Sequence, residues 1–144
     1  MTAATVFSIA NFFAMAGWLI LAGGVIFNRP YWRDQVAGTW WPLALSALYA
    51  FLILFFFFKA PGGFETLANV QLLFTAPWAA LAGWIHYLAF DLFIGAWIAR
   101  HLMQQGISRW WLLLLLPATF LFGPMGLVGL MILKTAFASR EETP

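Results

Sequence analysis

The stretch from Pro77 to Ile98 limits what this chain can fold into more than any other part of the sequence. Its 22 residues are almost all apolar. As an α-helix they would extend about 33 Å, close to the thickness of the hydrocarbon core of a bilayer. His86 and Asp91 interrupt this pattern near its middle. An ionised carboxylate there costs at least about 2.5–3.5 kcal/mol on insertion scales, so Asp91 is expected to face protein or water and to serve a function.

The composition extends this conclusion to the whole chain. Hydrophobic residues make up 64% of the 144 residues and charged residues 8%, whereas a soluble domain carries about 25% charged residues. No water-soluble fold of this size could bury so much apolar surface, so residues 1–144 are predicted to form a single integral membrane domain. The net charge of +2 is too small and too dispersed to indicate nucleic-acid binding.

The predicted fold is all-α, a membrane bundle of four spanning helices. The spans are Ala4–Phe27, Thr39–Phe58, Pro77–Ile98 and Trp110–Leu133. In the fourth, Gly123 and Pro124 predict a kink. Between the second and third spans, apolar residues of Phe64–Ala76 recur at helical spacing, which predicts a short helix lying at the membrane interface or partly re-entering the bilayer.

The distribution of positive charge predicts the orientation. One face of the four-span arrangement would carry Arg29, Arg33, Arg100 and Arg109, and the other would carry Lys59, Lys134 and Arg140. Because cytoplasmic loops are enriched in Lys and Arg, the face with four is assigned to the cytoplasm, and both termini are then expected outside it.

Within the third span, His86 and Asp91 lie on different sides of the helix. At about 100° per residue, Asp91 shares a face with Trp84 and Tyr87, and His86 points about 140° away. Either this helix is central in the bundle, or both side chains reach the edges of one cavity. His86 serves either as an interhelical hydrogen-bonding group or as a general acid or base. Asp91 is either tied to Arg100 or a tryptophan N–H, or functional.

Other polar and aromatic residues are candidates for a ligand site beside this pair. The predicted ligand-binding residues are Asn11, Trp18, Trp84, Tyr87 and Thr119. No metal site is predicted, because two histidines and one buried acid are too few for zinc, which needs three or four ligands.

Three segments carry a family resemblance: Phe7–Asn11 with Gly17 and Trp18, Pro77–Trp97 centred on Ile85–Phe93, and Pro117–Gly126. In these the chain resembles the bacterial branch of the small membrane proteins related to the plant neoxanthin synthase that is named for an abscisic-acid-deficient mutant. The resemblance implies a four-helix membrane protein connected with carotenoid chemistry. The expected location is the bacterial inner membrane, where the orientation predicted from the charges places both termini in the periplasm. Plant members take part in converting violaxanthin to neoxanthin, which opens an epoxide to an allene with no net redox change.

Such a step needs an acid for the epoxide oxygen and a base for a nearby C–H proton, and His86 and Asp91 are the expected catalytic pair. The predicted function is therefore a membrane-embedded carotenoid isomerase or epoxide-opening protein. The alternative is a non-catalytic carotenoid-binding or accessory subunit of a larger pigment–protein complex, and a weaker third hypothesis is a small proton-coupled transporter built on Asp91. No cofactor is expected other than a bound carotenoid. The expected partners are the bilayer, a carotenoid or other long apolar ligand, and a larger membrane complex or further copies of the chain.

Overall fold

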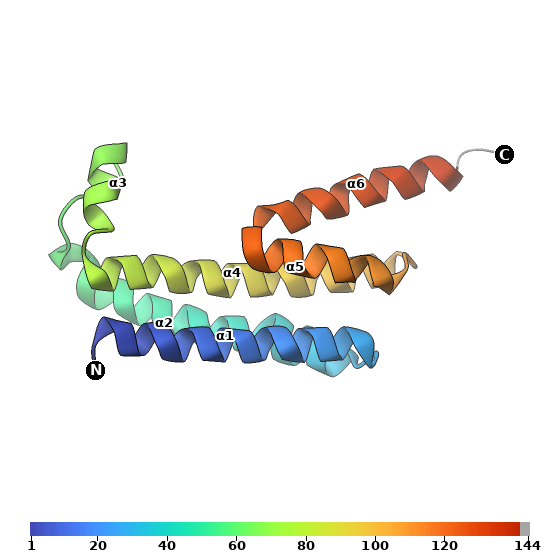
Figure 1. The fold of residues 1–144 in the computed structure, drawn as a ribbon, viewed down its shortest axis with the longest axis horizontal. Helices are drawn as coiled ribbons and strands as arrows, with labels where there is room; N and C mark the ends of the chain where they lie inside the picture. The colour runs from blue at the N-terminus through green and yellow to red at the C-terminus, as the bar shows by residue number, and fades with distance from the viewer. Residues whose placement is uncertain (142–144) are drawn as a thin grey trace.

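The computed structural model describes residues 1–141, with side chains described up to residue 137. In this range every regular element is helical (Figure 1). The elements are α1 (Ala3–Ile26), η1 (Tyr31–Trp40), α2 (Trp41–Phe56), η2 (Phe57–Lys59), α3 (Leu67–Leu73), α4 (Pro77–Gln104), η3 (Arg109–Trp111), α5 (Leu112–Phe122) and α6 (Pro124–Glu141). The all-α prediction is confirmed.

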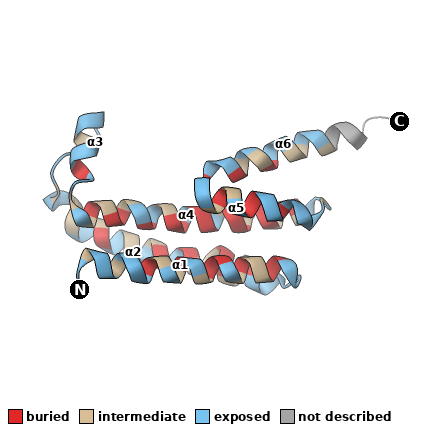
Figure 2. Cartoon of the chain, viewed as in Figure 1, coloured by how far each residue is buried: buried red, intermediate tan, exposed pale blue. Residues whose placement is uncertain are grey.

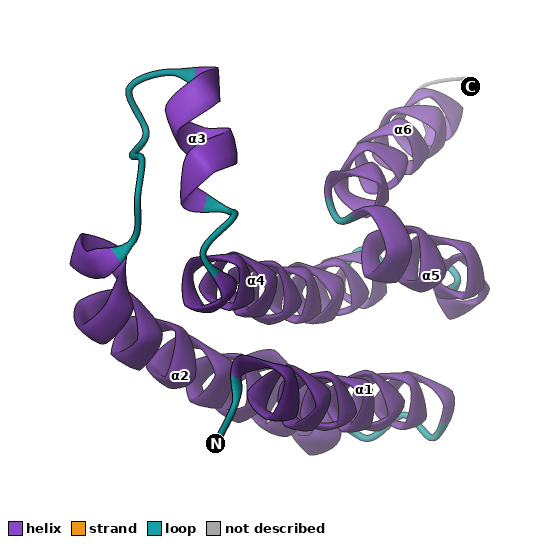
Figure 3. Cartoon of the chain, turned by 60° about the vertical axis from the view of Figure 1, so that its left-hand side comes forward, coloured by secondary structure: helices purple, strands orange, loops and turns teal. Residues whose placement is uncertain are grey.

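Three helical segments are long and apolar enough to cross a membrane: Ala3–Ile26, Tyr31–Lys59 and Pro77–Gln104. They lie side by side in Figures 1 and 3 and correspond to the first three predicted spans. The second begins at Tyr31 rather than at Thr39, because Pro30 already has helical backbone angles and starts the helix. The third continues beyond Ile98 to Gln104.

The first turns of the second span are wound as a π-helix, Tyr31–Trp40. Arg33 is buried there and forms a two-pronged ion pair with Asp34, both N···O distances being 2.7 Å. Its remaining guanidinium nitrogen donates to the sulfur of Met103 at 2.9 Å. Gly24 of α1 lies against the Arg33 backbone, where an added Cβ would come within 2.8 Å of the Arg33 nitrogen. This cluster joins η1 to the ends of α1 and α4.

The predicted fourth span at Trp110–Leu133 is not confirmed. The segment forms the two shorter helices α5 and α6, which meet at Gly123 and fold back as a hairpin, so that α6 returns toward the end of the bundle where α5 began (Figures 1 and 3). Gly123 has a φ of +48°, which glycine adopts readily. Pro124 has no N–H to donate back to the preceding turn, so α5 stops and the chain reverses.

Glycines on α6 hold the two arms of this hairpin close together. A Cβ at Gly126 would collide with the hydroxyl of Thr119, and one at Gly129 would come within 2.7 Å of a Leu115 methyl carbon. Small residues of this kind let membrane helices approach closely. The N-terminus and the described end of α6 consequently lie at opposite ends of the long helices (Figure 1), which does not agree with the expectation that both termini share one face.

The helix α4 is central in the bundle, which is one of the two arrangements that the positions of His86 and Asp91 allowed. Of its most apolar stretch 56% is buried, compared with 17% for Tyr31–Lys59 (Figure 2). It packs against α1, η1, α2, α5 and α6. A short helix is present between the second and third spans, α3, and it runs crosswise at one end of the long helices (Figures 1 and 3).

Candidate functional site

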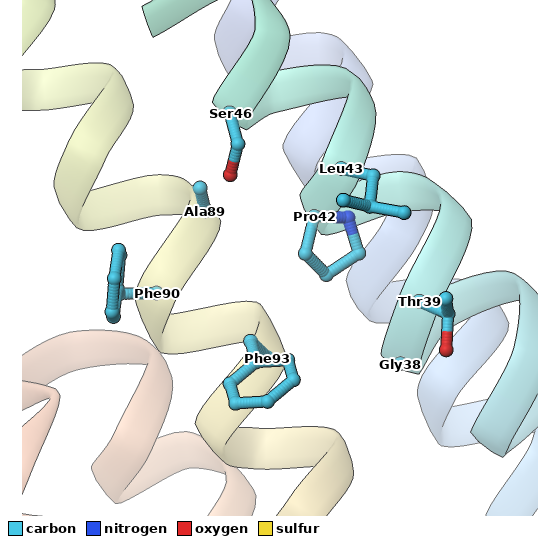
Figure 4. A pocket seen from close by; sticks show the side chains of 8 residues that line it. All are labelled: Gly38, Thr39, Pro42, Leu43, Ser46, Ala89, Phe90 and Phe93. Atoms are coloured by element: carbon cyan, nitrogen blue, oxygen red, sulfur yellow. The ribbon is translucent and has the colours of Figure 1, made fainter. Parts of the chain in front are cut away.

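Two cavities occupy the seam between α2 and α4. One has a volume of about 300 Å³ and is lined by Gly38, Thr39, Pro42, Leu43, Ser46, Ala89, Phe90 and Phe93 (Figure 4). The other has a volume of about 310 Å³ and is lined by Tyr49, Ile53, Phe57, Phe64, Leu73, Phe74, Ala79, Gly83 and His86. The side chains that line both cavities are mostly apolar and aromatic.

The helical repeat places these cavities end to end. The lining residues of α4 recur every three or four positions: Ala79, Gly83, His86, Phe90 and Phe93. Those of α2 and the following η2 do the same: Pro42, Ser46, Tyr49 and Ile53 of α2, and Phe57 of η2. Residues at this spacing share one helix face, and the two helices run in opposite directions (Figure 1). The two cavities are therefore aligned along one face of α4, and together they are called here the α2–α4 groove. Its α4 wall from Ala79 to Phe93 is about 21 Å long at about 1.5 Å per residue.

His86 lies near the middle of the α2–α4 groove. Its side chain is exposed toward the groove, and its ring stacks on Phe90 with centroids 4.6 Å apart. The ring of Tyr49 from α2 faces it at 5.3 Å. The other hydroxyls of the lining belong to Ser46 and to Thr39, and the Thr39 hydroxyl donates to the Asp34 carbonyl at 2.9 Å. His86 and Tyr49 thus place an imidazole and a phenol side by side in a groove whose other polar side chains are Ser46 and Thr39.

The connection through α3 covers one end of the groove. Phe74, just after α3, lies against Gly83 of α4, where an added Cβ would come within 2.6 Å of its ring. Phe64 stacks on Phe57 at 5.4 Å. The absence of a side chain at position 83 therefore allows aromatic residues of the connection to close over the cavity that contains His86.

Asp91 is located on another side of α4, against the bend between α5 and α6. It is buried, with 8% of its surface exposed. A Cβ at Gly123 would come within 2.6 Å of its Oδ1 atom. Its Oδ2 atom is buried and has no hydrogen-bond partner among the described residues. Tyr87, one turn earlier, is within interaction range of this carboxyl group and donates its hydroxyl proton to the Phe120 carbonyl at 3.2 Å.

The predicted ligand-binding residues make their contacts on the α1 and α5 sides of α4, and none of them lines the cavity of His86. The Trp84 indole N–H donates to the Asn11 side-chain oxygen at 3.0 Å, and the Trp84 ring stacks on Tyr87 at 5.4 Å. Trp18 meets Phe120 edge-on, also at 5.4 Å. Thr119 is fully buried, and its hydroxyl donates to the Leu115 carbonyl at 2.8 Å. Together these residues form a seam between α1, α4 and α5.

The structure therefore does not bring His86 and Asp91 together. His86 faces α2 and the α3 connection, whereas Asp91 faces the bend at Gly123. No hydrogen bond or ion pair joins them in the part of the chain that is described, where the one ion pair is between Arg33 and Asp34. Asp91 is accordingly not tied to Arg100. Within the same residues, no group of three or more His, Asp and Glu side chains is placed to hold a metal ion.

Sequence reasoning did not select Tyr49, Phe90 and Phe93 as site residues. The signal that could have found them is the spacing of three or four residues that connects them to His86 and Ser46 on the two groove faces.

Comparisons with known proteins identify one family. The family model described as ABA DEFICIENT 4-like matches residues 5–129, which include the α2–α4 groove, Asp91 and the bend at Gly123. No curated protein and no solved structure matches the chain.

Proposed function

We propose a function for this chain that starts from its family: the chain belongs to the ABA DEFICIENT 4-like family and is a carotenoid-related membrane protein. In this proposal it binds a xanthophyll along the α2–α4 groove and isomerises the epoxide end group of the xanthophyll. The observation that carries the proposal is the groove itself, in which two mainly apolar cavities lie in line and one of them is lined by both His86 and Tyr49. A straight, rigid polyene with a polar group near its ring needs a binding site of this shape and polarity.

In the proposed reaction, Tyr49 and His86 supply the acid and the base. The epoxide C–O bond breaks while the Tyr49 hydroxyl gives its proton to the oxygen, which becomes a hydroxyl group. His86 removes a proton from the adjacent polyene carbon, and the electron pair of that C–H bond forms the second double bond of an allene. His86 then returns a proton to Tyr49. No oxidant or reductant is consumed, and both residues return to their starting forms.

Assigning the acid to Tyr49 differs from the pair expected from the sequence. Tyr49 lies beside His86, with ring centroids 5.3 Å apart, on the wall of the same cavity. Asp91 lies on another face of α4 against Gly123, so a substrate in the groove would meet His86 without meeting Asp91.

The test compares His86→Gln with His101→Gln in cells that accumulate an epoxy-xanthophyll. His101 is the matched control because it lies outside the groove near the end of α4, stacked on Trp97 at 5.0 Å. Pigment chromatograms should show loss of the allenic product with His86→Gln, reduced product with Tyr49→Phe, and unchanged product with His101→Gln. Full conversion by His86→Gln would contradict the catalytic proposal.

A second function, carotenoid binding without chemistry, is favoured by the scarcity of polar groups in the groove. It predicts a stoichiometric carotenoid in the visible spectrum of protein purified in mild detergent, with no turnover of added xanthophyll. Ser46→Leu should lower pigment retention because Ser46 lines the groove. Ala47→Leu should not, because its exposed side chain is absent from the lining. Equal retention by these two variants would show that the pigment is not bound in the α2–α4 groove.

A further inference from the structure

The bend between α5 and α6 contains a buried carboxylate with an unsatisfied oxygen. Asp91 is 8% exposed, and its Oδ2 atom has no hydrogen-bond partner in the described part of the chain. Asp91 also lies near the middle of Pro77–Gln104, far from either end of the span. A polar atom in such a position carries a desolvation cost unless a partner binds it.

Among the side chains that the structure describes, up to residue 137, no cation supplies that partner. Facing Asp91 are Tyr87 of its own helix and the backbone at Gly123. The Thr119 hydroxyl on α5 already donates to Leu115. Of the arginines, Arg33 is paired with Asp34 at one end of the bundle.

The broken helix provides further oxygen atoms beside this carboxylate. Because Pro124 lacks an N–H, the Phe120 carbonyl accepts no hydrogen bond from the residue four positions later in the chain. It accepts a hydrogen bond from the Tyr87 hydroxyl instead. Carbonyl oxygens in the last turn of a helix lack donors within that helix and form its negative end. In broken membrane helices, such carbonyl groups and intramembrane acids bind sodium ions and protons.

We propose that Asp91 and the C-terminal turn of α5 form a binding site for a small monovalent cation, either sodium or a hydrated proton. The occupant must be small, because the Gly123 backbone is so close that a single Cβ there would lie 2.6 Å from Oδ1. It must be monovalent, because Asp91 is the sole acid at the site and no cluster of three ligating side chains exists in the described residues. The site does not depend on the proposed xanthophyll chemistry, since it lies on a different face of α4.

The test measures how cations affect Asp91 in the purified full-length protein in mild detergent. Dicyclohexylcarbodiimide, an apolar reagent that adds to protonated carboxyl groups, is applied in sodium chloride or in choline chloride of equal ionic strength. Peptide mass spectrometry locates the adduct, and thermal unfolding is followed under the same conditions. We expect an adduct on Asp91 in choline, saturable protection by sodium, and a higher Tm in sodium because a ligand that binds only the folded state stabilises it.

The outcomes distinguish the two cations and can overturn the site. Protection and a Tm increase with sodium identify sodium. Labelling that ignores sodium, together with a Tm that rises as the pH falls and loses this pH dependence in Asp91→Asn, identifies the proton, whereas labelling that merely declines as the pH rises, with no such Tm change, refutes the site. An Asp91 that is not labelled at any pH, or is labelled equally in all conditions, would refute the site. Asp91→Asn should lose both the adduct and the cation response. The control is Glu65→Gln, in the exposed connection before α3, which should retain the adduct on Asp91 and the cation response. The wild-type measurements decide the question even if Asp91→Asn does not fold.

Discussion

Replacing Gly123 with alanine should destabilise the protein more than the same change at Gly106. Both glycines have positive φ angles, +48° at Gly123 and +69° at Gly106. An alanine at either position costs at least about 1–2 kcal/mol, because side chains disfavour a positive φ. Gly123 also has a ψ of −94°, outside the left-handed helical region, so its backbone cost is no smaller than that of Gly106. At Gly106 nothing lies within 4 Å of the new Cβ, whereas at Gly123 it would be 2.6 Å from Asp91 Oδ1. Overpacking of this kind adds about 1–3 kcal/mol, so Gly123→Ala should exceed Gly106→Ala by about that amount.

The assay is equilibrium unfolding in mixed micelles of a mild detergent and sodium dodecyl sulfate, followed by far-ultraviolet circular dichroism. The double variant Gly123→Ala with Asp91→Ala removes the carboxylate that the new methyl group would meet. If the contact is the cause, the excess cost of Gly123→Ala should largely disappear in the Asp91→Ala background. Equal stabilities of the Gly123→Ala and Gly106→Ala proteins, or an excess unchanged by Asp91→Ala, would refute the packing of the hairpin bend on α4.

Two further predictions concern topology and the buried ion pair. The chain has no cysteine, so single cysteines introduced as Glu65→Cys or Ser108→Cys can be labelled with an impermeant maleimide in intact cells. We expect only the Glu65→Cys protein to react. Reaction of both proteins from outside the cell would contradict the topology. Arg33→Gln should lower the free energy of unfolding by about 1.5–3 kcal/mol, because it leaves the carboxylate of Asp34 without its charged partner. Arg29 is exposed, so Arg29→Gln should change the free energy of unfolding by less than about 0.5 kcal/mol. Similar effects of Arg33→Gln and Arg29→Gln in the same unfolding assay would mean that the Arg33–Asp34 ion pair is not stabilising.

The first three spans were predictable because a bilayer demands length and apolarity, and both can be read from a sequence. The fourth is not confirmed: Trp110–Leu133 has the length and apolarity of a span, but the segment forms two shorter helices, Arg109–Phe122 and Pro124–Phe137. Gly123 and Pro124 predicted an interruption, but the angle after it depends on how the two arms pack. That packing arises from contacts of Gly126 and Gly129 with α5. Tertiary contacts between small residues thus converted an expected kink into a reversal.

The sequence predicts a site residue well when the free-energy cost of placing that one side chain in a membrane is high. It predicts a site less well when the site is formed by residues from different helices. The expense of a carboxylate in hydrocarbon correctly indicated that Asp91 would face protein. The helical angle of about 140° between Asp91 and His86 already indicated separate faces. Whether those faces met a common cavity depended on which helices flank α4. The structure places the α2–α4 groove beside His86 and the hairpin bend beside Asp91.

The hairpin also changes the orientation argument, because it moves positive charge from one end of the bundle to the other. With four spans, Lys134 would lie opposite the arginine-bearing connections. With α6 folded back, it lies toward the end that carries Arg29, Arg33, Arg100 and Arg109 (Figure 1). Of the described basic side chains only Lys59 then remains at the other end. Because positive charge is enriched on the cytoplasmic side, we expect the arginine-bearing end to lie there, together with the described end of α6. The N-terminus and the α3 connection then lie on the opposite side, which is why Glu65→Cys and not Ser108→Cys should react from outside the cell.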